Sequence, residues 1–130
     1  MNIKDELIEL LNQSYAPYSG FAVSSIVVMK DGKYFKGVNV ENASYGATVC
    51  AERVAIWNAV AAGYRKGDFH KLYVMVDRDK ISSSCFLCRQ VILEFFDPED
   101  EIIFSNRKGD AKRYYVREIC PFPFDQEDLR

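Results

Sequence analysis

Two short cysteine motifs constrain the fold of this chain more than any other feature of its sequence. Cys50 is followed by Glu52, and farther along the chain Cys85 and Cys88 form a Cys-x-x-Cys motif. Both motifs fall at the starts of predicted helices, where the partial positive charge of the helix N-terminus lowers thiol pKa values and stabilises thiolates. Two helix starts that face each other would gather the three thiols around one metal ion. A metal site of this kind would therefore require the fold to bring two helix N-termini together.

An odd number of thiols beside a carboxylate is typical of a catalytic zinc site. A structural zinc site uses four protein ligands, whereas a catalytic site uses three and leaves a position for water. A carboxylate beside that water moves protons in zinc hydrolases. Glu52 lies about 200° around an ideal helix from Cys50, at roughly 100° per residue. It therefore faces the open side of the ion only if the chain turns where it enters the helix.

Other interpretations of the cysteines remain open at this point. Cys85 and Cys88 can form a thioredoxin-like redox pair, or Cys120 can complete a closed structural zinc site as a fourth ligand. Three thiolates also outweigh the charge of Zn²⁺, so a nearby cation is expected. Arg53 and Arg89, each directly after a motif, are the candidates, and either can instead be an ordinary surface arginine.

Size and charge favour one small-molecule-binding domain that spans residues 1–130. The net charge of -2 and the pI of about 5.4 give no basic surface for polymeric nucleic acid. The N-terminal residues are polar and acidic, unlike a signal peptide, and no apolar run has the length of a membrane span. We therefore expect a cytoplasmic protein whose four cysteines are thiols or metal ligands.

The order of predicted elements indicates an α/β fold. Strands that alternate with helices predict parallel pairs within a mixed sheet, with helices on its faces. Asp31-Gly32 is a strong hairpin turn between the first two strands. The predicted helices cover residues 3–11, 49–62 and 85–96, and the predicted strands cover 21–29, 34–38, 72–76, 101–104 and 113–116. From Pro121 onward the chain is expected to be irregular.

The chain carries four motifs in order: Tyr15-Ala16-Pro17-Tyr18-Ser19 followed by Phe21, Asn39 to Gly46, Cys50-Ala51-Glu52-Arg53, and Cys85-x-x-Cys88-Arg89-Gln90. Together they resemble the short, homotetrameric, zinc-dependent cytidine deaminases. The resemblance implies a three-layer α-β-α domain with a mixed five-stranded sheet. It also implies hydrolytic deamination of cytidine and deoxycytidine to uridine and deoxyuridine, with release of ammonia, in pyrimidine salvage.

The resemblance also assigns roles to individual residues. Cys50, Cys85 and Cys88 are expected to hold one Zn²⁺ per chain, Glu52 to transfer protons, and Arg53 to balance the thiolate charge. The expected substrate contacts are Asn39 and Glu41 on the ribose, Phe21 and Phe124 against the pyrimidine, and Ser44 and Tyr45 nearby. In the tetrameric members, the C-terminal ring and the tyrosine that matches Tyr45 come from neighbouring subunits. Phe122 lies close to Phe124 in the sequence and can instead be the residue that matches this C-terminal ring.

The chain departs from the family pattern around its second motif. The family usually has proline before the second cysteine and glycine after it, where this chain has Ser84 and Phe86. We expect the Ser84 hydroxyl to cap the helix in place of proline, and Phe86 either to narrow the pocket or to pack outward. Ser24 also replaces a usual glycine. Two other functions remain open: a blasticidin-type deaminase, and a zinc-binding structural protein without activity.

Overall fold

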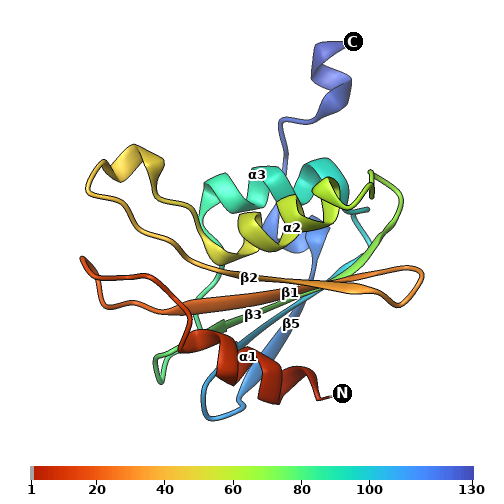
Figure 1. Cartoon of the computed structure of the whole chain (residues 1–130). Coiled ribbons are helices and arrows are strands. Elements are labelled where there is room, and N and C mark those ends of the chain that lie inside the picture. Colours follow the sequence, from red (N-terminus) through yellow and green to blue (C-terminus); the bar gives the residue numbers. More distant parts are fainter. Residues whose placement is uncertain (1) are drawn as a thin grey trace.

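A five-stranded sheet forms the middle of the molecule, in the order β2-β1-β3-β4-β5 (Figure 1). The computed structural model describes residues 2–130. Strands β3 and β4 run parallel, and the other neighbouring strands run antiparallel, so the predicted mixed sheet is confirmed. The strands are β1 (Val23–Met29), β2 (Tyr34–Val38), β3 (Phe69–Val76), β4 (Glu101–Asn106) and β5 (Ala111–Tyr115).

Helices cover both faces of this sheet, which confirms the predicted three-layer α-β-α architecture. Helices α2 (Ala51–Ala61) and α3 (Phe86–Phe95) lie on one face, and α1 (Ile3–Leu11) lies on the other (Figure 1). Because side chains alternate along a strand, Val27 packs in the core under α2 and α3 while its neighbour Ile26 packs against α1. Within the described residues, no helix has the length and apolarity needed to cross a membrane.

Gly37 on β2 allows α2 to lie directly on the sheet. A Cβ atom at this position would clash with the carbonyl oxygen of Ala51 and would lie 2.5 Å from the backbone nitrogen of Ala55. Both are backbone atoms of α2 and cannot move without shifting the helix. The absence of a side chain at Gly37 therefore fixes how close the start of α2, with its cysteine motif, comes to the sheet.

We expect Gly37→Ala to destabilise the protein by about 3 kcal/mol, because the added methyl group overpacks a contact between two backbones. Gly46→Ala is the matched control, since a Cβ atom there meets nothing within 4 Å and Gly46 does not need a positive φ. Urea unfolding of both variants measures the difference. Equal stability of the two variants would show that α2 can move away from β2 at little cost.

The structure corrects several predicted boundaries. Strand β3 begins at Phe69, earlier than predicted, and Phe69 packs against Phe96 in the core. The polar residues that follow Phe69 had hidden the alternation of apolar and polar residues that indicates a strand. The predicted strand 113–116 ends at Tyr115, where a capping box with Glu118 starts the short helix α4 (Val116–Ile119). The tail is not fully irregular, since it contains the 3₁₀ helix η2 (Gln126–Leu129).

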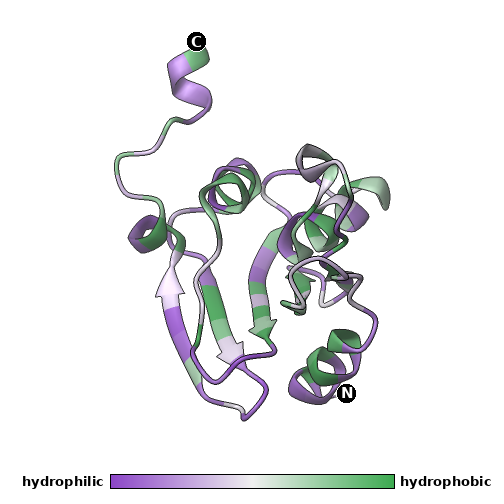
Figure 2. Ribbon diagram, turned by 90° about the vertical axis from the view of Figure 1, so that its left-hand side faces the viewer, coloured by the Kyte–Doolittle hydropathy of each residue, from purple (hydrophilic) through white to green (hydrophobic). Residues whose placement is uncertain are grey.

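The C-terminal segment, residues 121–130, extends away from the sheet, beyond α3 (Figures 1 and 2). Phe122 is fully exposed, and the side chain of Phe124 is 58% exposed. Two hydrogen bonds connect the segment to α3, from Gln90 Nε2 to the carbonyl of Phe124 and from Gln126 to Glu94. One chain thus leaves two phenylalanine rings of the tail largely uncovered.

Candidate zinc centre

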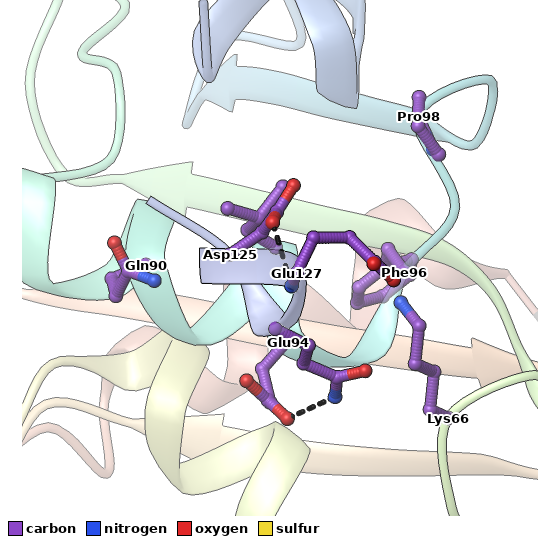
Figure 3. A pocket seen from close by; sticks show the side chains of 9 residues that line it. Lys66, Gln90, Glu94, Phe96, Pro98, Asp125 and Glu127 are labelled. Carbon is purple, nitrogen blue, oxygen red and sulfur yellow. Dashed lines mark hydrogen bonds between the residues drawn. The ribbon is translucent and has the colours of Figure 1, made fainter. Parts of the chain in front are cut away.

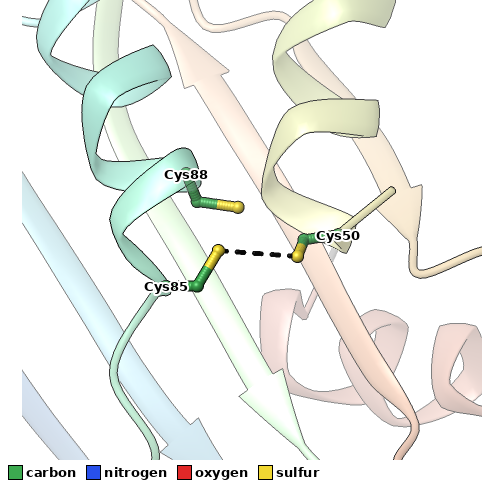
Figure 4. Close-up of side chains that lie close together, drawn as sticks. All are labelled: Cys50, Cys85 and Cys88. Atoms are coloured by element: carbon green, nitrogen blue, oxygen red, sulfur yellow. Dashed lines mark hydrogen bonds between the residues drawn. The ribbon is translucent and has the colours of Figure 1, made fainter. Parts of the chain in front are cut away.

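The structure gathers the three motif cysteines at one point. The sulfur atoms of Cys50, Cys85 and Cys88 all lie within 4.8 Å of one another, and those of Cys50 and Cys85 are 3.7 Å apart (Figure 4). Cys88 is buried, Cys50 is half-buried and Cys85 is exposed, so the cluster opens to one side. Three thiols at this separation form a ligand set that fits Zn²⁺ and leaves one position open.

The starts of two helices bring these thiols together. Cys50 is the N-cap of α2 and Cys85 is the N-cap of α3, both with extended backbone, and Cys88 follows in the first turn of α3. The two helices lie side by side on the same face of the sheet (Figures 1 and 4). The predicted helix over 49–62 was wrong at this point, because it placed Cys50 inside the helix.

This change of backbone at Cys50 decides where Glu52 lies. Because Cys50 precedes the helix in extended conformation, the angular separation of an ideal helix does not apply to the pair. Glu52 is 4% exposed. Burial raises the pKa of its carboxyl group and is the largest influence on it. The Ser84 side chain opposes this rise, and the negative charge of Cys50 adds a smaller one. A carboxyl group with a raised pKa is suited to accept and return protons near neutral pH.

The thiols themselves do not ionise alike. Hydrogen bonding from Cys88, followed by Arg53 and Cys85, lowers the pKa of Cys50 to about 5, although burial opposes this shift. The same interaction raises the pKa of Cys88, because its thiol donates a hydrogen bond to the Cys50 thiolate, whose charge disfavours a second negative charge. A bound cation would stabilise all three thiolates, since metal binding displaces such protons.

Of the two arginines named as candidate cations, Arg53 lies at the thiols. Its Nη2 donates to the sulfur of Cys50 at 3.6 Å, and its guanidinium lies 5.9 Å from the ring centre of Trp57. The Nε of Arg53 is buried and has no hydrogen-bond partner within residues 2–130. The positive charge of Arg53 therefore acts directly on one of the candidate ligands.

Arg89 is occupied elsewhere. Its Nε and Nη1 donate to the carbonyl oxygens of Ser84 and Ile119, at 2.8 and 2.9 Å, and its Nη2 donates to the hydroxyl of Ser83. The ring of Phe86 stacks on this guanidinium at 4.4 Å and is 77% exposed. Phe86 thus packs outward, away from the thiols, and Arg89 connects the segment before α3 to the end of α4.

Two further expectations at the second motif are settled by the geometry. The Ser84 hydroxyl does not cap α3, because Cys85 is the N-cap residue and the helix has no side-chain cap. Cys120 lies outside the thiol cluster, and its thiol donates to the carbonyl of Arg89 at 3.6 Å. The structure therefore gives no support to a closed site with four thiolates.

Asn39 directly follows β2 and lies beside the start of β1, with its side chain engaged by the protein. Its Oδ1 accepts hydrogen bonds from the Ser14 hydroxyl and the N–H of Val23, and its Nδ2 donates to the carbonyl of Phe21 at 2.7 Å. One amide N–H remains for a ligand. The ring of Phe21 is half-buried and stacks on the guanidinium of Arg78 at 4.8 Å.

Glu41 and Tyr45 line a common pocket of about 360 Å³. Ser44 is exposed beside Tyr45 and does not line this pocket. Glu41 accepts hydrogen bonds from the backbone N–H groups of Tyr18 and Ser19, and from the hydroxyl of Ser19. The Ser19 hydroxyl lowers the pKa of Glu41. The motif that contains Tyr18 and Ser19 was noted in the sequence, but their contact with Glu41 was not predicted. The other lining residues are Asn42 and Thr48.

Phe124 lies apart from that pocket within one chain. It lines a separate cavity of about 280 Å³ with Phe86, Phe122 and Cys120. Another small cavity, of about 140 Å³, lies between α3 and the tail and is lined by residues such as Lys66, Glu94 and Glu127 (Figure 3). None of the predicted site residues lines the cavity between α3 and the tail, so this cavity does not contribute to the candidate site.

Comparisons with known proteins cover most of the chain. The sequence model of the cytidine and deoxycytidylate deaminase zinc-binding region matches residues 2–104. A cytidine deaminase of Halalkalibacterium halodurans is 38% identical over 95% of this chain and 92% of the relative, and one of Sporosarcina psychrophila is 40% identical over 90% and 85%. The crystal structure of cytidine deaminase from Burkholderia pseudomallei superposes with a TM-score of 0.85, at 41% identity, over 95% of this chain and all of that one.

These matches include both cysteine motifs and Glu52, while Cys120 and the tail lie beyond the region that the sequence model matches. Identity near two residues in five, over nearly the whole length of independent relatives, is accompanied by the same fold. The chain therefore belongs to the cytidine and deoxycytidylate deaminase family of hydrolytic enzymes.

Proposed function

We propose that the chain deaminates cytidine and deoxycytidine to uridine and deoxyuridine, with release of ammonia, as a step of pyrimidine salvage in the cytoplasm. The observation that carries this proposal is a buried glutamate beside a cluster of three thiols, in a chain of this family. Cys50, Cys85 and Cys88 would hold one Zn²⁺ per chain. When bound, Zn²⁺ lowers the pKa of a water to about 7 and makes it a nucleophile at neutral pH.

Glu52 is assigned the proton transfers. It accepts a proton from the water that attacks C4 of the pyrimidine, delivers a proton to ring N3, and then protonates the departing amine. Its raised pKa supports this assignment, because one group must both accept and return protons. Arg53 offsets part of the negative charge of the thiolates through its contact with Cys50.

The substrate is assigned to the open side of the thiol cluster. Glu41 and the free amide N–H of Asn39 are assigned to the ribose hydroxyls, and Phe21, Ser44 and Tyr45 to the walls of the site. A site that hydrogen-bonds a sugar hydroxyl strongly rejects analogues that lack it, which favours a nucleoside over a free base. The net charge of -2 favours such a small substrate over polymeric nucleic acid.

The proposal also includes assembly of four copies of this chain into a homotetramer. Phe124 lies in a separate cavity within one chain, and Tyr45 is 80% exposed. Trp57 on α2 is also 49% exposed. Neighbouring copies that cover these rings would allow Phe124 and Tyr45 to act in a site of another subunit.

The zinc-loaded protein should convert cytidine and deoxycytidine to the uracil nucleosides, followed by the ultraviolet change and by release of ammonia. The same protein after chelation of zinc is the control. Turnover of blasticidin S in preference to both nucleosides would favour the blasticidin-type activity. The absence of turnover of any of the three by protein with one zinc per chain would rule out the proposed reaction and favour a structural role.

A further inference from the structure

The hydroxyl group of Ser84 is buried without a hydrogen-bond partner. Ser84 is 4% exposed, and its Oγ makes no hydrogen bond within residues 2–130. A buried polar group without a partner destabilises a fold, so each such group calls for an explanation. This one immediately precedes Cys85, and the helix cap that would have explained it is absent.

The backbone of Ser84 is fixed from the opposite side. Its carbonyl oxygen accepts a hydrogen bond from Arg89 Nε at 2.8 Å, and the same guanidinium also holds the carbonyl of Ile119. With the main chain anchored in this way, the remaining freedom of Ser84 is rotation of its side chain and its hydroxyl hydrogen. Because Ser84 directly precedes Cys85, the N-cap of α3, its hydroxyl lies beside the point where the starts of α2 and α3 meet.

Glu52 is a buried hydrogen-bond acceptor at this junction. It lies in the first turn of α2, as deeply buried as Ser84, and the sulfur atoms that join the two helix starts are 3.7 Å apart. The Ser84 hydroxyl lies near enough to Glu52 to lower the pKa of its carboxyl group, against the effect of burial. A buried carboxylate needs hydrogen-bond donors, and a hydroxyl group is a strong donor to it.

We propose that Ser84 is a positioning residue, whose hydroxyl donates a hydrogen bond to the Glu52 carboxylate and holds it in one orientation at the thiol cluster. The inference rests on the proposed function, because it assigns Glu52 the proton transfers. Proline, which the family pattern usually has at this position, carries no hydroxyl. The chain therefore orients its glutamate with a donor that the usual pattern does not provide.

Ser84→Ala should lower kcat for cytidine about tenfold to a hundredfold, as expected for loss of a hydrogen bond to a charged group, while KM and one zinc per chain are retained. Ser84→Thr keeps the hydroxyl and should restore most of kcat, whereas Ser84→Pro should behave as Ser84→Ala. Ser82→Ala, which removes a hydroxyl two residues away, is the matched control and should match the unaltered protein. Wild-type kcat in Ser84→Ala would overturn the inference.

A second measurement does not depend on activity. Urea unfolding of the zinc-loaded Ser84→Ala, Glu52→Ala and double variants forms a double-mutant cycle, in which a direct hydrogen bond appears as non-additive changes. Additive changes would overturn the inference even if the protein deaminates cytidine. An inactive unaltered protein would instead overturn the proposed function, and the cycle would still show whether Ser84 and Glu52 interact.

Discussion

Glu52→Ala should lower kcat for cytidine by about 10²- to 10⁴-fold while the protein keeps one zinc per chain. The carboxyl group is buried beside the thiols, and burial raises its pKa towards the range useful for proton transfer. Without it, neither the attacking water nor the departing amine has a positioned group with which to exchange a proton. None of the three candidate zinc ligands is changed, so metal binding should persist.

Steady-state kinetics together with zinc analysis by atomic absorption tests this expectation. Glu9→Ala is the control, because Glu9 is an exposed carboxylate of α1 on the opposite face of the sheet. Loss of zinc in Glu52→Ala would show that Glu52 supports or ligates the metal, and the proton-transfer assignment would then be wrong. Full activity with zinc retained would contradict the assignment directly.

The sequence predicted the layers of the fold because periodic burial determines them. Val27 and Ile26 alternate between the two cores of the sheet, and the predicted hairpin turn at Asp31 and Gly32 connects the antiparallel strands β1 and β2. Such patterns repeat over several residues, so one atypical residue does not hide them. The order of elements was therefore predictable, while the end of β5 was not, because it depends on a single capping box.

The candidate site was predictable in its residues but not in its orientations. Spacing alone showed that Cys50, Cys85 and Cys88 could meet, but the direction of Glu52 depends on one extended residue before α2. Likewise, the sequence favoured Arg53 for the charge-balancing role, but it did not show that Arg53 contacts a thiol while Arg89 holds two backbone carbonyls. These differences arise from tertiary contacts between segments far apart in the chain.

The orientation of the side chain at position 86 was likewise not predictable from the sequence. The sequence left open whether the large ring of Phe86 narrows the pocket or packs outward, and the structure stacks it on Arg89 with most of its surface exposed. The decisive contact is with a residue three positions later on the same helix, where side chains are neighbours. The departure from glycine at this position therefore leaves the thiol cluster open.

Cys85→Ala should weaken zinc binding by more than a hundredfold, because a site with two remaining thiolates loses a third of its protein ligands. Zinc that binds the folded state stabilises it, and each hundredfold of affinity at a fixed free zinc concentration corresponds to about 2.7 kcal/mol. We therefore expect a lower melting temperature for this variant in zinc-containing buffer. The difference from the unaltered protein should shrink after zinc is removed from both.

Cys120→Ala provides the matched control, since it removes a half-buried thiol outside the cluster. It should keep one zinc per chain and should show the same gain in melting temperature on addition of zinc as the unaltered protein. Zinc titration with a competing chelator measures both affinities. Retention of zinc by Cys85→Ala, together with its loss from Cys120→Ala, would contradict the ligand set and with it the open coordination position that the proposed chemistry requires. Loss of zinc from Cys85→Ala, together with its retention by Cys120→Ala, would place the metal at the junction of α2 and α3, beside Glu52.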